Sequence, residues 1–262
     1  MKKTLIALAL ATSAMTSYSA MAVSGGSWGE TGHNFELSGN IAINSAQNIW
    51  EVFSGVSDDL GTVNITKGAK EVVFTAGHAI PVLGIRSVEV FTGRAGVAPQ
   101  ISYGNGALDL NSFASNKADF TLSVKDKTSG EELGVLKTKL YAGARGSWKT
   151  VDGTNSYKSA IYAAKAGDAF YGGAPKTTAG LDTAGLSAGL KDIIPSILDK
   201  YDSQGAGKGA PMIWSFTGNT RTYSAYYAAG IQSDEPITVT LNNVPEQDVS
   251  WTASLPVTVT YM

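Results

Sequence analysis

Alternation of apolar and polar side chains is the clearest pattern near the beginning of the chain. Apolar side chains occupy every second position from Phe35 to Ile43, and Gly39 interrupts the series. This period of two predicts a strand with one apolar face. The preceding residues 23–32 are rich in glycine and serine and show no periodicity, which is typical of a flexible leader.

Short apolar runs separated by turn residues predict many more strands. A hairpin is expected at Ala118–Val124 and Leu133–Tyr141, because Thr128-Ser129-Gly130 in the connection is typical of a turn. Short strands at this spacing indicate a mainly β fold of the sandwich type. The other predicted strands are Asn48–Phe53, Leu60–Thr66, Lys70–Thr75, Val82–Thr92, Gln100–Tyr103, Ile213–Phe216, Thr222–Gly230, Ile237–Leu241 and Ser250–Tyr261.

The middle of the chain has a different pattern. Ser156–Ala169 is rich in alanine, and its larger side chains recur at roughly helical spacing. Leu181–Tyr201 places leucine and isoleucine on one helical face, and Pro195 marks a break or the first turn of a new helix. The order of strands, helices and strands indicates one sandwich with an inserted region at about 104–212.

A long half-buried strand is predicted at the C-terminus, where apolar and polar side chains alternate from Trp251 to Tyr261. Its edge would be open to aggregation if no neighbouring strand covered it. The strand at 35–43 can supply that neighbour to another subunit, and head-to-tail contacts would then produce a filament. The alternative is an ordinary first strand that pairs within its own sheet.

Residues 1–22 have the pattern of a signal peptide. Lys2 and Lys3 precede an apolar run, and Ala20-Met21-Ala22 matches the small-x-small cleavage pattern. The apolar run is shorter than the ~20 residues that span a bilayer, which argues against a membrane anchor. We therefore expect a signal peptide at 1–22, an N-terminal extension with a donor strand at 23–43, and one domain at 44–262.

Composition excludes several functional classes. The net charge of −2 argues against a nucleic-acid partner, which would favour a basic surface. The chain has no cysteine, which excludes disulfides and a thiol-based zinc site. It has two histidines and neither an H-E-x-x-H nor a G-x-S-x-G motif. We expect a protein that is not an enzyme and binds no cofactor or metal.

Five short motifs along the chain carry a resemblance to a known family. They are Leu37–Ile41, Pro99–Ile101, Tyr141–Gly143, Ala169–Gly173 and Val257–Tyr261. The segment Phe170–Gly173 is the most distinctive, because it lies in the inserted region. In these motifs the chain resembles the FaeG-like major adhesive subunits of chaperone–usher fimbriae from enterotoxigenic enterobacteria.

The resemblance implies an incomplete immunoglobulin-like sandwich that donor-strand exchange completes. A periplasmic chaperone would fill the groove first, and at an outer-membrane usher the next subunit's N-terminal extension would replace it. The resemblance also implies a homopolymer that is secreted through the periplasm, forms a fimbrium on the cell surface and binds host glycoconjugates. The implied donor positions are Phe35, Leu37, Gly39 and Ile41, and the C-terminal strand for the chaperone and usher carries Leu255, Val257, Val259 and Tyr261.

The family's carbohydrate site lies in the inserted region, where residues 143–157 form a candidate glycan-binding loop. Trp148 occurs among glycine and polar residues, and an aromatic face flanked by polar side chains suits a sugar. Two alternatives stay open: these residues form turns and packing contacts, or the chain is a purely structural shaft subunit whose adhesion is carried by another subunit. The candidate residues are Arg145, Trp148, Lys149, Asp152, Asn155 and Tyr157.

Overall fold

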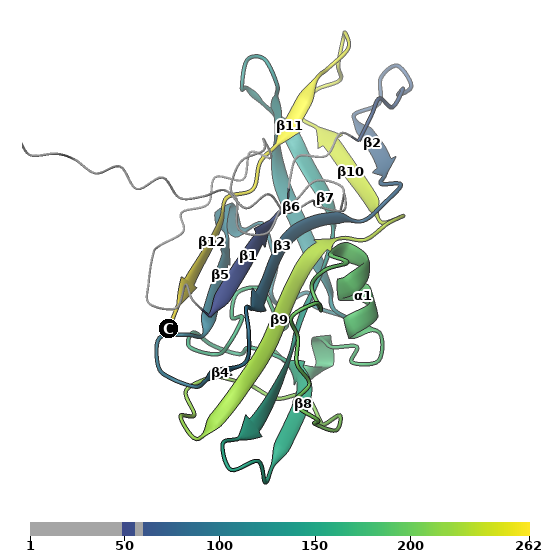
Figure 1. Ribbon diagram of the computed structural model, residues 1–262. Helices are drawn as coiled ribbons and strands as arrows, with labels where there is room; N and C mark the ends of the chain where they lie inside the picture. The colour runs from purple at the N-terminus through teal and green to yellow at the C-terminus, as the bar shows by residue number, and fades with distance from the viewer. Residues whose placement is uncertain (1–48, 56–59) are drawn as a thin grey trace, which may run out of the picture.

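The part of the chain that the structure describes folds into antiparallel sheets with one short α-helix, so the expectation of a mainly β fold is confirmed (Figure 1). The computed structural model describes residues 49–55 and 60–262. Helix α1 spans Leu186–Ile193, and short 3-10 turns lie at Gly104–Gly106 and Thr178–Gly180. The described strands are β1 (Trp50–Ser54), β2 (Glu71–Thr75), β3 (Ile80–Ser87), β4 (Phe91–Thr92), β5 (Pro99–Tyr103), β6 (Lys117–Asp126), β7 (Glu132–Thr150), β8 (Ser156–Ile161), β9 (Arg221–Ile231), β10 (Pro236–Leu241), β11 (Trp251–Ala253) and β12 (Val257–Tyr261).

Strand β7 is the centre of the main sheet, whose described order is β1-β3-β9-β7-β10-β2. Along one edge, β7 pairs first with β6 and then with β8; along the other edge it pairs first with β10 and then with β9. A second, two-stranded sheet consists of β5 and β12. All of these pairings are antiparallel, and the two sheets are consistent with a β-sandwich.

The predicted hairpin of β6 and β7 is confirmed, and its turn has a local cause. Asp126 accepts hydrogen bonds from the backbone N–H groups of Thr128 and Ser129 at 2.9 and 2.8 Å. Gly130 takes a positive φ of 75°, which a glycine adopts without strain. The turn fixes the register in which Lys117 of β6 lies opposite Tyr141 of β7.

The largest apolar core contains side chains from both sheets and from the loops between them. Trp50 lies in this core as expected, with its ring 5.3 Å from Phe91 and 5.7 Å from Phe170. Its indole N–H donates to the carbonyl of Val97 at 2.7 Å, which satisfies the one polar atom of this buried side chain. Trp214 is buried in the same core.

Helix α1 covers the other face of the main sheet. Leu186, Leu190 and Ile193 follow one helical face and are buried against β7 and β9. The close approach requires Gly143 of β7, because a Cβ there would lie 2.5 Å from a methyl group of Leu186. The helix is shorter than the predicted Leu181–Tyr201. It ends at Ile193, and the next residue, Ile194, is extended because proline at the following position disfavours the α conformation.

Two predictions for the middle of the chain are wrong. Residues 143–157, expected as a loop, form the end of β7, a turn and the start of β8. Ser156–Ala169, expected as a helix, begins with β8, which is hydrogen-bonded to β7 from Ser156 to Ile161. Pairing along the edge of β7 outweighs the helix propensity of the alanine residues, because tertiary contacts routinely override intrinsic propensity.

Three strand predictions also need correction. Leu60–Thr66 and Ile213–Phe216 belong to no described strand. The expected C-terminal strand is interrupted before Val257, so that β11 pairs with β6 and β12 pairs with β5. Pro256 explains the interruption, because proline has no N–H for a ladder; its carbonyl instead accepts from Gly104 at 2.7 Å.

The range 104–212, expected as an inserted region, holds β6, β7, β8 and α1. Strand β7 within it is hydrogen-bonded to β9 and β10 outside it. This part of the chain therefore shares the main sheet with the flanking strands.

Candidate functional sites

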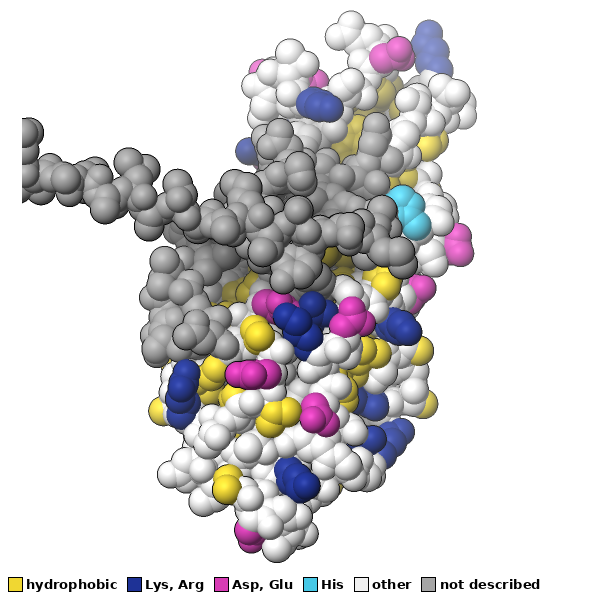
Figure 2. Space-filling view, in the orientation of Figure 1, with side chains coloured by type: hydrophobic (Ala, Val, Ile, Leu, Met, Phe, Trp, Pro, Cys, Tyr) yellow, Lys and Arg dark blue, Asp and Glu magenta, His cyan; other side chains and the backbone are white. Residues whose placement is uncertain are grey.

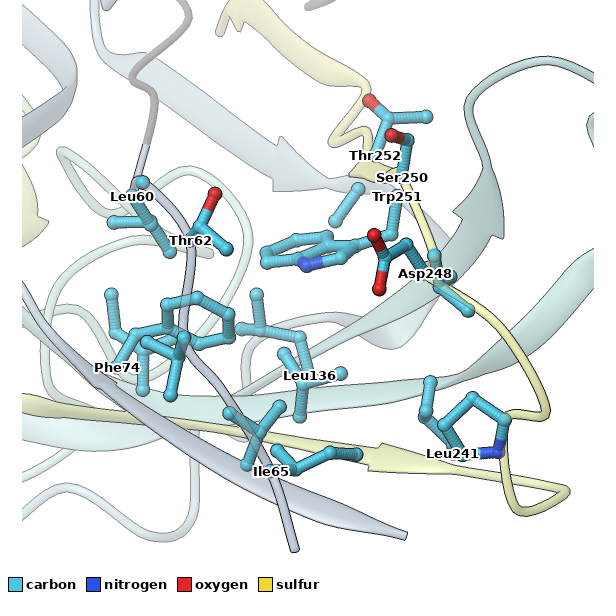
Figure 3. A pocket seen from close by; sticks show the side chains of 18 of the residues that line it. Leu60, Thr62, Ile65, Phe74, Leu136, Leu241, Asp248, Ser250, Trp251 and Thr252 are labelled. Atoms are coloured by element: carbon cyan, nitrogen blue, oxygen red, sulfur yellow. The ribbon is translucent and has the colours of Figure 1, made fainter. Parts of the chain in front are cut away.

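An open groove of about 1660 Å³ lies at the end of the molecule that holds β2, β10 and β11. Figure 3 shows Leu60 and Thr62 on one wall, Trp251 projecting from the opposite wall, and Phe74 and Leu136 between them. The first wall is the segment 60–69, and the second is the segment 244–255 that contains β11.

The interior of the groove is apolar. Phe74, Leu136, Ile237 and Val239 line it, and each is almost completely buried. Trp251 contributes an edge-to-face contact with Phe74, with the ring centroids 5.5 Å apart. An apolar side chain that entered this groove would gain roughly 1.5–3 kcal/mol by leaving water.

The backbone at the walls of the groove has free pairing capacity among the residues that the structure describes. Strand β11 pairs there only with β6, and β2 pairs only with β10. The segment 60–66 belongs to no described ladder. An additional strand could therefore be bound by backbone hydrogen bonds as well as by apolar contacts.

The four predicted residues of the C-terminal strand do not share one environment. Leu255 is buried and lines the groove. Val259 is buried in the main core opposite Ile101 of β5, whereas Val257 and Tyr261 are only partly buried. Burial raises the pKa of Tyr261 to about 12. The predicted donor residues Phe35, Leu37, Gly39 and Ile41 lie outside the described residues.

The candidate glycan residues lie on the hairpin of β7 and β8, at the opposite end of the molecule from β2 and β11 (Figure 1). Trp148 faces Tyr157 across this hairpin, and their rings are stacked with centroids 6.1 Å apart. The guanidinium carbon of Arg221, from β9 on the other side of β7, lies 4.1 Å from the centroid of the Trp148 ring. The three side chains thus form a row across three strands, which we call the aromatic row.

The aromatic row is partly covered by other groups. The Tyr157 hydroxyl donates to the carbonyl of Ala210 at 2.8 Å, and Gly209 lies so close to the Tyr157 ring that a Cβ there would overlap it. Because Arg221 and Tyr157 flank the Trp148 ring, a sugar would contact the exposed edge of the row and not an open ring face.

Asp152 and Asn155 are engaged in the turn between the two strands. Asp152 Oδ1 accepts from the N–H of Thr154 at 3.0 Å and from its hydroxyl at 2.8 Å. Hydrogen bonds from Thr150 and Thr154 lower the pKa of the Asp152 carboxyl. Asn155 Nδ2 donates to the Thr154 hydroxyl at 3.1 Å. These contacts favour the turn interpretation of both residues.

Arg145 and Lys149 occupy the opposite face of the hairpin from Trp148. Side chains alternate across a strand, so odd-numbered residues at this end of β7 face α1 and even-numbered ones face the main core. Arg145 Nη2 donates to the carbonyl of Thr183 at 3.0 Å, in the segment directly before α1. The structure therefore separates the six candidates into the aromatic row, the turn and a basic face.

Two residues near these sites were missed in the sequence. Arg221 lies about seventy positions from Trp148, and only the register of β9 against β7 brings them together. Tyr201 packs edge-on against Tyr226, with ring centroids 4.9 Å apart, on the same face as Arg145. No local sequence motif marks either contact.

Acidic and basic side chains are interspersed on the face of the molecule shown in Figure 2, which carries no continuous basic surface. In the described part of the chain, no group of three side chains is placed to hold a metal ion. No helix among the described residues has the length and apolar character needed to cross a membrane.

Comparison with known proteins gives a consistent result along the whole chain. A family model described as "Fimbrial, major and minor subunit" matches residues 1–262. The chain is 27% identical to the K88 fimbrial protein AB of Escherichia coli over 290 aligned positions, and 27% identical to the F41 fimbrial protein of the same organism over 288. Both alignments cover 100% of this chain and 100% of the relative.

Proposed function

The chain belongs to the family of fimbrial major and minor subunits, and we propose that it polymerises by donor-strand complementation and acts as the adhesin of its fimbrium. Membership of this family makes it a component of a surface fimbrium. Its relatives are fimbrial proteins, and it is not an enzyme.

The groove between β2, β10 and β11 is the observation that supports polymerisation. It combines an apolar interior with walls whose backbone has free pairing capacity among the described residues. A strand with one apolar face matches both properties, and Phe35, Leu37 and Ile41 provide such a face. Gly39 would pass where the groove is shallow.

The proposed assembly route follows from this match. Residues 1–22 direct the chain to the periplasm, residues 23–43 form the extension with the donor strand, and residues 44–262 form the domain that accepts it. A periplasmic chaperone occupies the groove first, and the outer-membrane usher exchanges it for the extension of the next copy. The exchange joins copies head to tail into a homopolymer.

Charge substitution in the donor strand tests this proposal. In Leu37→Arg, a charged side chain would have to enter an apolar groove, so we expect no filaments by electron microscopy of the cell surface. The matched control is Ser38→Arg, one residue away on the other face of the strand, which should leave filaments intact. Filaments of normal length in the Leu37→Arg strain would contradict the proposal, provided that the secreted protein is present in equal amount.

The adhesin part of the proposal is supported by the aromatic row on the hairpin of β7 and β8. Trp148 and Tyr157 are partly exposed at the end of the molecule away from the groove, so polymerisation through the groove need not cover them. A glycan array probed with filaments should show specific binding, and Trp148→Ala should abolish it without unfolding the chain.

The second candidate function is that of a purely structural shaft subunit. It is favoured by the contacts of Arg221 and Tyr157 with the Trp148 ring, which are the contacts of a packed side chain. Filaments that form normally and bind no glycan on the array would support this function against the adhesin.

A further inference from the structure

Strand β1 is the first element of the domain after the proposed donor extension. The strand begins at Trp50, and the extension with the donor strand ends at residue 43. In a donor-strand polymer the extension lies in the groove of a neighbouring copy. A pull along the filament would therefore enter this subunit at the beginning of β1.

The direction of β1 determines how such a pull would act on it. Trp50 at the beginning of the strand pairs with Ser87 at the end of β3. Directly after the strand, Gly55 N–H donates to the carbonyl of Val82 at 3.0 Å, and Val82 lines the groove. Strand β1 thus runs from the side of the extension towards the groove that would hold the strand of another copy (Figure 1). Tension between the two copies would slide β1 along β3.

Backbone pairing alone gives β1 little resistance to sliding. Within the part of the chain that the structure describes, β1 is an edge strand whose five residues pair only with β3. Because side chains alternate with a period of two, a slip by two residues would keep the same side chains on the same face. Resistance to such a slip has to come from specific side-chain contacts.

Three charged side chains fix the position of β1 against its neighbours. Glu51 lies directly opposite Arg86 in the register of β1 and β3, and Glu51 Oε1 accepts from Arg86 Nε. Glu51 Oε2 accepts from Lys200 Nζ at 2.9 Å, in the segment 194–201 that follows α1. Arg86 Nη1 donates to the carbonyl of Ser196 in the same segment. Glu51 therefore joins β1 both to β3 and to the segment 194–201.

The burial of this cluster strengthens its contacts. The side chains of Arg86 and Glu51 are 6% and 17% exposed. Paired charges attract each other more strongly away from water, and removal of one partner leaves the other charge uncompensated there. Phe53, on the same face of β1, is buried in one apolar cluster with residues of the segment 194–201. A slip of β1 would have to break the ion pairs and displace Phe53.

We propose that Glu51, Arg86 and Lys200 form a register lock that holds β1 in place against the pull of neighbouring copies in the filament. The proposal rests on donor-strand assembly and gives the segment after α1 a mechanical role in it. Sliding of β1 under load breaks these contacts before the rest of the sheet separates. Contacts that are lost in the transition state control the rate of unfolding, and this rate governs unfolding by force.

Single-molecule force spectroscopy on residues 23–262 tests the lock. The chain has no cysteine, so Ser45→Cys before β1 and Thr128→Cys in the β6–β7 turn beside β11 provide two unique attachment points. Lys200→Met removes one ion pair of Glu51 and leaves the other intact. At constant force we expect Lys200→Met to raise the unfolding rate about threefold, and Glu51→Gln to raise it about tenfold or more.

Lys117→Met is the matched control. Lys117 pairs with Glu235, and their side chains are 39% and 12% exposed, compared with 38% and 17% for Lys200 and Glu51. The control removes the cation that pairs with Glu235, so in urea it should lower the free energy of unfolding at least as much as Lys200→Met. It should leave the unfolding rate under force unchanged, because neither Lys117 nor Glu235 belongs to β1 or contributes to the lock.

The comparison separates a lock from a general contribution to stability. A larger rise in the unfolding rate under force for Lys200→Met than for Lys117→Met supports the lock, and equal rates would overturn it. Filaments provide a second readout: Lys200→Met cells should carry filaments of normal length by electron microscopy but lose more of them in shear flow.

The filament experiments also distinguish failure of the lock from failure of donor-strand assembly. Lys200→Met filaments that withstand shear as well as Lys117→Met filaments would overturn the lock and leave donor-strand assembly standing. Filaments of normal length in the Leu37→Arg strain would instead refute donor-strand assembly, whatever the unfolding rates under force.

Discussion

Gly172 offers a sharp test of the packing that holds the β5–β12 sheet. It adopts a φ of 86°, and a Cβ at this position would overlap the carbonyl oxygen of Ile101 in β5. The two residues directly before Gly172 are hydrogen-bonded to β5: Phe170 N–H donates to the carbonyl of Pro99 at 2.7 Å, and Ile101 N–H donates to the carbonyl of Tyr171 at 2.8 Å. The backbone therefore cannot move away without breaking hydrogen bonds.

The expected cost of Gly172→Ala has two parts. The positive φ costs about 1–2 kcal/mol for a residue with a Cβ, and the steric overlap costs a further ~1–3 kcal/mol. Gly167→Ala is the matched control, because Gly167 has a φ of 90° and no atom within 4 Å of the added Cβ. The control should lose only the first part, which leaves a difference of about 2 kcal/mol between the two variants.

Urea unfolding followed by tryptophan fluorescence measures the free energy of unfolding of both variants. In thermal unfolding of a chain of this length, a difference of ~2 kcal/mol corresponds to a difference of about 4–8 °C in Tm. Equal free energies of unfolding for Gly172→Ala and Gly167→Ala would refute the reasoning, because the steric overlap with Ile101 would then carry no cost.

Three further predictions concern other parts of the molecule. Leu190→Ala in α1 removes a fully buried side chain and should lower the free energy of unfolding by about 2–5 kcal/mol in urea unfolding. Burial raises the pKa of Tyr201 and of Tyr261 to about 12 each, so both hydroxyls lose their protons at a lower pH in the unfolded chain than in the folded chain. The free energy of unfolding, measured by urea unfolding, should therefore fall as the pH rises from about 10 to 12. It should fall less steeply in Tyr261→Phe, which lacks one of these hydroxyls. Arg221→Ala removes the cation over Trp148 and should shift the tryptophan emission while lowering stability by only about 0.5–1 kcal/mol.

Many strand positions along the chain could be predicted, because the alternation of apolar and polar side chains reflects which face of a strand is buried. The hairpin of β6 and β7 shows this well, since its alternation and its turn residues agree. The segment 143–157 was predicted wrongly, although it held a usable signal: Asp152-Gly153 is a hairpin turn sequence, and Gly153 has a φ of 77°. The helical prediction for Ser156–Ala169 failed because pairing with β7 is a tertiary effect that alanine content does not record.

The candidate glycan site shows what the sequence cannot give. Trp148 and Tyr157 were selected for their chemistry, and the structure does bring them together. Arg145 was selected for the same reason. Side chains alternate between the two faces of a strand, so the face on which Arg145 lies cannot be assigned when the segment is predicted to be a loop. Arg221 was missed because its contact with Trp148 depends on the register between two strands distant in sequence.

Strand β7 links the two ends of the molecule and determines how they can influence each other. Leu136 of this strand lines the groove and Trp148 lies in the aromatic row, about 40 Å away at ~3.4 Å per residue. Every residue between them is paired on at least one edge, to β6 or β8 on one side or to β10 or β9 on the other. Occupation of the groove can therefore proceed without rearranging the hairpin. Because residues this far apart share no partner, substitutions at the two ends should add independently, and assembly and glycan binding can be impaired one at a time.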